Sequence, residues 1–318
     1  MLASLASLAH YSLVTNPQKR GVPLITASNV TKRFDDVTAL DAINMHVPSG
    51  VVYGLVGSNG AGKTTLIRHL CGAYRQDSGE VRIDGQHIYE NNTVKMRTGV
   101  IPDELYFYPQ GSTHDMAKFY SGIYPNFDWD YYRSLASAFP IDEKRAIRRL
   151  SKGMQKQSAF WLAIACRFDV LLLDEPVDGL DPVMRRTVWN LLSDDVAQRG
   201  LTVVVSSHNL RELEDVCNHV GIMHKGKVVI ERSLSELQEG AYKLQAAFEG
   251  DLPETIPGMD ELHRSQNGKV YNIIARGNSD NAANLLANFS PLFIDVVPLS
   301  LEEVFIYEMG GENYGGIF

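Results

Sequence analysis

Short apolar runs and helical segments alternate along most of the chain. Three apolar runs, Val51–Val56, Val170–Leu173 and Leu201–Ser206, have the length and composition of strands that are buried on both faces of a sheet. A helix is predicted over about Lys63–Cys71, after the first run, and another begins near Pro182, between the other two. Strands and helices that alternate at this spacing predict an α/β fold around a parallel sheet.

Antiparallel pairs are predicted on either side of this alternation. Leu24–Arg33 and Ala42–Val47 indicate two short strands joined by a polar turn, and Glu80–Ile83 leads into an Asp-Gly turn that is typical of a hairpin. A further hairpin is predicted from Gly221–Met223 and Lys227–Ile230. The region up to about residue 235 therefore combines parallel and antiparallel strands.

The middle and the end of the chain follow other patterns. Residues 104–157 are helical in pattern and rich in aromatic side chains, which indicates a helical subdomain with its own core. After residue 235 we expect a small α+β domain with a loop over Asp251–Gly258. Its predicted elements are strands Tyr242–Phe248, Lys269–Ala275 and Phe293–Val297 and helices Asn281–Asn288 and Leu301–Met309. The predicted division is an N-terminal extension without an assigned role (1–22), a main domain (23–235) and a C-terminal domain (236–318).

Composition narrows the class of protein. The 318 residues are 44% apolar and 21% charged, the balance of an ordinary globular protein, which excludes a mainly disordered or collagen-like chain. The net charge of −8 argues against nucleic acid as a partner, because proteins that coat nucleic acid usually carry a basic surface. Three widely separated cysteines, Cys71, Cys166 and Cys217, predict free thiols. No apolar run reaches the roughly 20 residues of a membrane-spanning helix.

A glycine-rich loop joins the first apolar strand to its helix. Residues 57–64 satisfy the G-x-x-x-x-G-K-[ST] pattern of a phosphate-binding loop, and the strand and helix that the pattern requires flank it. In such a loop the backbone N–H groups ring a phosphate, Lys63 reaches the β and γ oxygens, and the Thr64 hydroxyl can bind Mg²⁺. A chance glycine-rich turn would not explain both flanking elements. The expected nucleotide-binding residues here are Gly57, Ser58, Asn59, Gly60, Ala61, Gly62, Lys63, Thr64 and Thr65.

Two acidic residues end the second apolar run. Asp174 and Glu175 follow it directly, and carboxylates at the carboxyl end of a parallel strand lie beside the phosphate crevice. We expect Asp174 to bind Mg²⁺, through water, and Glu175 to act as the general base on an attacking water. An acidic pair at a strand end is commonly a surface feature, and only the upstream loop favours the catalytic interpretation.

Further motifs resemble those of the ATP-binding-cassette (ABC) ATPases, in the order typical of that family and over about residues 28–232. Leu150–Gln155 is similar to the LSGGQ signature, Val177–Pro182 to the D-loop, and Ser206–His208 to the segment with the switch histidine. Phe34 stands where the family stacks an aromatic ring on adenine. The resemblance implies a P-loop ABC ATPase core with an antiparallel β subdomain, a helical signature subdomain, and ATP and Mg²⁺ as cofactors.

Two departures from the family pattern matter. Lys152 and Met154 replace the first glycine and the glutamine of LSGGQ, while Ser151 and Gly153 remain as the donors expected to meet ATP. The glutamine of the family's Q-loop is missing, and Asp103 is the expected stand-in, as a catalytic and Mg²⁺-binding carboxylate, with Glu104 as the alternative. Both departures resemble the branch that serves exporters, often with a C-terminal appendage.

The resemblance implies a mechanism and partners. Two ATPase subunits, identical or related, would stack head to tail, so that Ser151 and Gly153 of one meet the ATP held by Lys63, Glu175 and His208 of the other. A separate integral-membrane permease would form the transport path, with this chain peripheral on the cytoplasmic face of the membrane. Most aromatic residues of 104–157 are expected to pack within the helical subdomain, but those near Asp103, with Tyr106, Phe107 and Tyr108 as the best candidates, would form the groove for a permease helix.

Two other functions remain open at this point. A soluble ABC ATPase could act on ribosomes or DNA, although the chain has neither the long coiled coils nor the second cassette typical of such proteins. A non-hydrolysing nucleotide sensor would keep the phosphate loop without needing Glu175 or His208. The cargo and the direction of transport do not follow from these residues.

Overall fold

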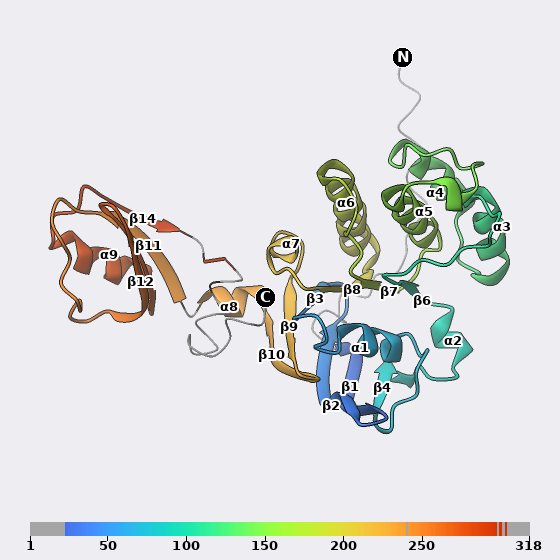
Figure 1. Cartoon of the computed structure of the whole chain (residues 1–318), viewed down its shortest axis with the longest axis horizontal. Helices are drawn as coiled ribbons and strands as arrows, with labels where there is room; N and C mark the ends of the chain where they lie inside the picture. Colours follow the sequence, from blue (N-terminus) through green and yellow to red (C-terminus); the bar gives the residue numbers. More distant parts are fainter. Residues whose placement is uncertain (1–22, 240, 298, 301–302, 304–318) are drawn as a thin grey trace, which may run out of the picture.

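The computed structural model describes residues 23–239, 241–297, 299–300 and 303, and is shown in Figure 1. It has a six-stranded central sheet in the order β10-β9-β3-β8-β7-β6. The five strands from β9 to β6 are parallel, and β10 pairs with β9 in the antiparallel sense. The bounds of the strands are β3 Val52–Val56, β6 Thr98–Ile101, β7 Val170–Asp174, β8 Thr202–Ser207, β9 His219–His224 and β10 Lys227–Ser233.

Both faces of the central sheet are covered, because its strands are apolar on both sides. Along β7, Leu171 and Leu173 point into one core cluster, whereas Val170 and Leu172 point into the other, as the two-residue period of a strand requires. Helices α5 (Lys152–Ala165) and α6 (Pro182–Arg199) lie on one side, and α1 (Lys63–Leu70) lies on the other (Figure 1). The predicted α/β class is confirmed.

A second, antiparallel sheet packs beside α1 and has the strand order β2-β1-β4-β5. Its alternating apolar residues, such as Ile25, Met45 and Val81, share the core cluster of Leu66 on α1. The predicted strands and the Asp-Gly hairpin are confirmed, with somewhat longer bounds. These are β1 Pro23–Phe34, β2 Val37–Pro48, β4 Ser78–Ile83 and β5 Gln86–His87, and the short α2 follows at Asn92–Lys95.

The helical region differs in part from its prediction. Residues 104–111 contain no helix, so Tyr106, Phe107 and Tyr108 lie in a loop. The prediction counted these aromatic residues as helical because composition, not a 3.6-residue period, dominates this segment. The helices here are α3 Thr113–Ile123, α4 Trp129–Ser134, the 3₁₀ turns η2 Leu135–Ser137 and η3 Ile147–Arg149, and α5.

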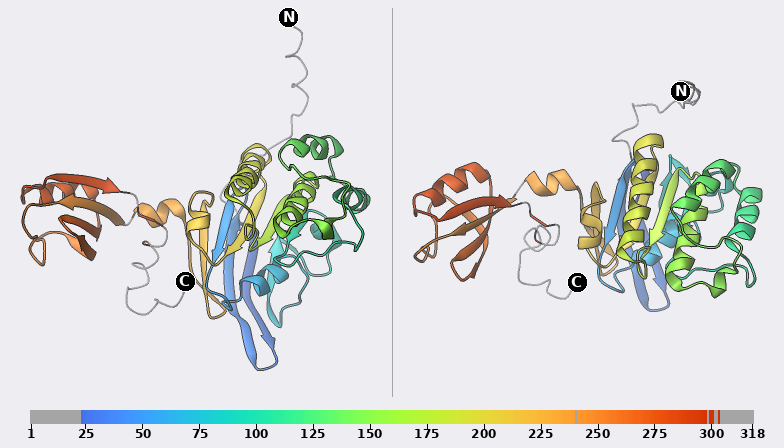
Figure 2. Two further views of the ribbon diagram at one scale, coloured as in Figure 1. Left: turned by 45° about the horizontal axis from the view of Figure 1, so that its top comes forward. Right: turned by 90° about the horizontal axis from the view of Figure 1, so that it is seen from above.

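The C-terminal region forms a third sheet, in the order β12-β13-β11-β14, with its own apolar core. It lies beyond α8 (Leu234–Glu239), away from the central sheet (Figure 2), while α7 (Arg211–Glu214) lies beside β9 (Figure 1). The bounds are β11 Ala241–Ala247, β12 Asp260–Asn267, β13 Val270–Arg276, α9 Ser279–Ala287 and β14 Phe293–Val297. The sequence did not predict β12, in which Leu262 is the one apolar residue. The expected extension 1–22 and nearly all of the expected helix Leu301–Met309 lie outside the described residues.

Candidate nucleotide site

A cavity of about 410 Å³ lies where β3 leads into α1. Its lining includes Asp103 and Glu175, which follow β6 and β7, and Lys225 and Gly226 in the turn between β9 and β10. The carboxyl ends of parallel strands meet at this edge, where ligands bind in open α/β sheets. The lining residues are Val37, Thr38, Ala39, Asn59, Gly60, Gly62, Lys63, Thr64, Thr65, Asp103, Glu175, Lys225 and Gly226.

The phosphate loop can form because glycines stand at its crowded positions. Gly62, which precedes α1, has φ of 107°, and a Cβ there would lie 2.7 Å from the Ala39 carbonyl oxygen. A Cβ on Gly57 would lie 2.4 Å from the Met223 carbonyl oxygen. Only glycine meets both demands, and the N–H groups of the first turn of α1 are left facing the cavity.

Glu175 lies between two basic side chains. Its Oε1 is 3.2 Å from the Lys63 ammonium, and its Oε2 is 2.9 Å from His208 Nδ1. Lys63 is buried and also donates to the Gly57 carbonyl at 2.7 Å, whereas the side chain of His208 is 47% exposed. Ligand atoms of Glu175, Asp178 and His208 all lie within 4.8 Å of one another. The structure therefore brings three of the predicted residues, Lys63, Glu175 and His208, into one group.

The backbone of Glu175 is held in an uncommon conformation. Its φ of 45° lies in the left-handed region, which non-glycine residues seldom adopt. The Glu175 N–H donates to Ser206 Oγ at 3.1 Å, and the same hydroxyl donates to Asp174 Oδ1 at 2.6 Å. Ser206 thus links both acidic residues. Ser206 belongs to the segment that resembles the family's switch segment, but its motif predicts no role for it.

Lys156 is a second residue near the site that the sequence analysis missed. It lies on α5, is buried, and donates from Nζ to the Glu175 carbonyl oxygen at 2.8 Å. Its ammonium is also 3.8 Å from a carboxylate oxygen of Asp103. Glu104, the alternative to Asp103, accepts a hydrogen bond from Tyr106 and does not line the cavity. A lysine next to a signature motif gives no sign in the sequence that it is buried.

The remaining predicted residues lie outside the cavity lining. Ser151 caps α5 by accepting the Met154 N–H, and Gly153 is so close to the Gly179 carbonyl oxygen that a Cβ would lie 2.6 Å from it. The ring of Phe34 packs edge-on against Tyr74, with the ring centroids 5.8 Å apart. The other predicted residues outside the lining are Gly57, Ser58, Ala61, Asp174 and His208.

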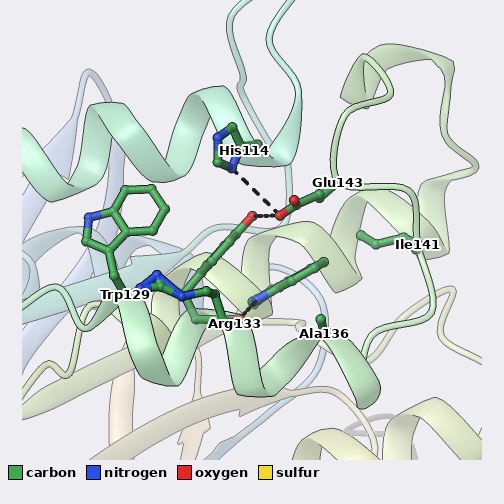
Figure 3. Close-up of a pocket in the computed structure, with 8 residues that line it drawn as sticks. His114, Trp129, Arg133, Ala136, Ile141 and Glu143 are labelled. Carbon is green, nitrogen blue, oxygen red and sulfur yellow. Dashed lines mark hydrogen bonds and ion pairs between the residues drawn. The ribbon is translucent and has the colours of Figure 1, made fainter.

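A second cavity of about 420 Å³ lies within the helical region (Figure 3). Tyr132 and Trp161 stack in its wall with their ring centroids 4.9 Å apart, and the Tyr132 hydroxyl donates to Glu143. Its other lining residues are His114, Trp129, Arg133, Ala136 and Ile141. It shares no residue with the nucleotide cavity, and its rings pack the interior of the helical region. Of the aromatic residues predicted to meet a permease, Tyr106 and Tyr108 are exposed, whereas Phe107 is half-buried against the core.

Among the described residues, no helix combines the length and apolar composition that crossing a lipid bilayer would require.

Comparisons with known proteins agree with the motifs. The family model described as "ABC transporter" matches residues 40–178. The ABC transporter ATP-binding protein YtrB of Bacillus subtilis is 32% identical over 290 residues, which cover 91% of this chain and 99% of that protein. The bacitracin transport ATP-binding protein BcrA of Bacillus licheniformis is 27% identical over 304 residues, 92% of this chain and 99% of that protein.

Solved structures show the same fold. The ATP-binding subunit of an ABC transporter superposes with a TM-score of 0.63 at 22% identity, covering 68% of this chain and 92% of that one. The dimeric bacterial ABC transporter cassette MJ0796 superposes with a TM-score of 0.61 at 20% identity, covering 66% of this chain and 98% of that one. With a cassette fold, a phosphate loop and these relatives, the chain belongs to the ABC transporter ATP-binding proteins, the ATP-hydrolysing subunits of ABC transporters.

Proposed function

We propose that this subunit drives a separate membrane permease, as an exporter, by hydrolysing ATP in the cavity beside Glu175. The observation that carries the proposal is the placement of the Glu175 carboxylate, which lines that cavity, between Lys63 and His208. A carboxylate at this position can accept a proton from a water that attacks the γ-phosphate. Lys63 and His208 would then hold the phosphate oxygens, because both can donate to anionic oxygen.

The cavity has the parts that a nucleoside triphosphate needs. The Lys63 ammonium lies beside Glu175, and Thr64 and Thr65 stand in the first turn of α1, whose N-terminus favours anions. Val37, Thr38 and Ala39 of β2 also line the cavity, and Val37 pairs with Phe34 of β1. We infer that the triphosphate lies along the loop and the base lies toward Phe34.

The residues present fit a Mg²⁺ ion. The Asp174 carboxylate is buried and oriented by Ser206, and the Thr64 hydroxyl and Asp103 carboxylate line the cavity. Hard oxygen donors of this kind suit Mg²⁺, which keeps several waters when it binds beside phosphates. We propose Thr64, Asp174 and Asp103 as its holders, directly or through water; bound there, the ion would neutralise charge on the phosphate oxygens.

We further propose that two subunits act together. Ser151 and Gly153 lie outside the cavity lining of their own chain, and Ser151 stands at the N-terminus of α5, where an anion is favoured. In a head-to-tail dimer these donors would meet the ATP of the second copy. The solved cassette MJ0796, which has the same fold, is described as dimeric. ATP bound between the copies would favour the closed dimer by mass action.

The exporter assignment rests on the relatives. BcrA, which aligns along nearly its whole length, is named for bacitracin transport. The exposed rings of Tyr106 and Tyr108 follow Asp103 and offer an apolar surface to a permease at the cytoplasmic face of the membrane.

Affinity purification of this chain from its native membranes, with identification of the co-purifying proteins and an ATPase assay, tests the proposal. We expect a protein with several membrane spans that raises ATP hydrolysis by the chain. Recovery of ribosomal or DNA-bound proteins without a permease would contradict it and favour a soluble ABC ATPase. A Tyr106→Ala, Tyr108→Ala double variant should lose the permease while keeping ATP binding.

A further inference from the structure

We propose that Lys156 is a positioning residue for ATP hydrolysis: it holds the backbone of Glu175 in the hydrolytic conformation, and Asp103 acts through it. The inference rests on the proposed catalytic role of Glu175. Three observations carry it, namely the burial of the Lys156 ammonium, its hydrogen bond to the Glu175 carbonyl oxygen, and its proximity to Asp103.

The first observation is that Lys156 is buried, with 7% of its surface exposed. A buried ammonium is costly unless charged or polar groups surround it, and an apolar side chain of the same length would fill the space without that cost. Among the described residues, the polar contacts of its Nζ are the Glu175 carbonyl at 2.8 Å and the Asp103 carboxylate at 3.8 Å. The charge is therefore directed at the site.

The second observation concerns what the contact restrains. Glu175 has φ of 45°, and from this backbone conformation its side chain reaches both Lys63 and His208. Ser206 fixes the N–H of Glu175 and Lys156 fixes its carbonyl, so side chains hold both of its backbone polar groups. A residue in a sparsely populated conformation persists when its surroundings determine it in this way.

The third observation is the position of Asp103. It is more than half exposed, lines the cavity and follows β6, whereas Lys156 lies on α5, the helix that Ser151 caps. The ion pair thus connects the segment leading into the helical region with the signature helix and the catalytic carboxylate. A neutral residue at 103 would leave the buried ammonium with the Glu175 carbonyl alone.

Steady-state ATP hydrolysis by the full chain carrying Lys156→Met tests the inference. We expect kcat to fall about tenfold or more, while the KM for ATP and the affinity for a fluorescent ATP analogue change by less than about threefold. Lys156→Arg should recover part of the loss, because arginine keeps the donor and the charge. Lys118→Met, which removes an exposed ammonium from α3, is the matched control and should behave as wild type.

Three results would overturn the inference: hydrolysis by Lys156→Met within twofold of wild type, no recovery with arginine, or a parallel loss of nucleotide affinity. Should Lys156→Met not fold, the arginine and glutamine variants keep the test, with kcat expected to fall from wild type through arginine to glutamine. A wild-type chain without ATPase activity would instead contradict the proposed function.

A double variant tests the role of Asp103. If part of the effect of Asp103 passes through Lys156, Asp103→Asn should lower kcat by a smaller factor in the Lys156→Met chain than in the wild-type chain, because the contact with the ammonium is already lost. The same fold loss in both chains would contradict this part of the inference and leave Asp103 with the proposed Mg²⁺ contact alone.

Discussion

At the residue scale, the site is organised around the bonds that hold Glu175. Lys63 and His208 meet its carboxylate, and Ser206 and Lys156 meet its backbone. The phosphate-loop pattern predicted Lys63, and the resemblance of Ser206–His208 to the family's switch segment predicted His208. The sequence could not predict the others, since a serine in a strand and a lysine in a helix acquire these contacts only when the chain folds.

Ser206→Ala tests the shared hydroxyl. The substitution removes two hydrogen bonds, one to Asp174 and one from the Glu175 N–H, and each is worth about 0.5–1.5 kcal/mol. We expect kcat for ATP hydrolysis to fall about tenfold if this energy holds the transition-state geometry. Ser207→Ala serves as the control, because the Ser207 hydroxyl instead forms hydrogen bonds with the backbone N–H and carbonyl of Asn209. Equal effects of both substitutions would argue for general destabilisation.

The thiols give a prediction that concerns pH. Burial raises the pKa of Cys166 and Cys217 far above the usual range and also raises the pKa of Cys71. Since the thiolate is the reactive form, little of it exists near pH 8. In the native protein we expect iodoacetamide to modify Cys71 slowly, faster as pH rises past 9, and to spare Cys166 and Cys217. Mass spectrometry shows which thiols react, and rapid labelling of Cys166 or Cys217 would contradict the buried packing.

At the scale of elements, local pattern predicted most of the sheet but not all of it. The strands Val52–Val56, Val170–Asp174 and Thr202–Ser207 are uniformly buried, so their apolar runs were clear in the sequence. β12 (Asp260–Asn267) was missed because all but one of its residues are polar and most are exposed, and only pairing with β13 makes it a strand. β6 (Thr98–Ile101) was missed because four residues beside a loop carry too little pattern.

The phosphate loop gives a test at this scale. Gly62→Ala should lower the free energy of unfolding by about 1–3 kcal/mol, because alanine would be strained at φ of 107° and its Cβ would press on the Ala39 carbonyl. Chemical denaturation without nucleotide measures the effect. Gly122→Ala, in helix α3 with open space around the Cβ, should instead be neutral or stabilising. A Gly62 variant as stable as wild type would contradict the loop geometry.

At the scale of the whole molecule, we propose that the chain has two domains, 23–235 and 236–318. The C-terminal sheet has a core of its own, in which Leu244, Ile273 and Leu286 are buried, and it lies beyond α8 (Figure 2). It contributes no residue to the nucleotide cavity. We therefore expect the C-terminal sheet to affect ATP binding little.

Ile273→Ala tests this independence. Ile273 is fully buried, and its truncation should cost about 2–5 kcal/mol. Hydrogen exchange should become faster in β11, β13 and β14, with unchanged protection of β3 and β7 and ATP affinity within twofold of wild type. Faster exchange throughout the chain would show that the two regions unfold as one unit.

The central claim is that Glu175 is the residue that makes this chain an ATPase, and comparing Glu175→Gln with wild type tests it most directly. Measured at saturating ATP and Mg²⁺, hydrolysis should fall at least about 100-fold, since a glutamine cannot accept the proton of the attacking water. Light scattering after size exclusion should show an ATP-dependent dimer that accumulates in the variant. Glu249→Gln, which changes an exposed side chain in the C-terminal domain, should leave the hydrolysis rate and the amount of dimer as in wild type. A Glu175→Gln chain that hydrolyses ATP like wild type would contradict the account.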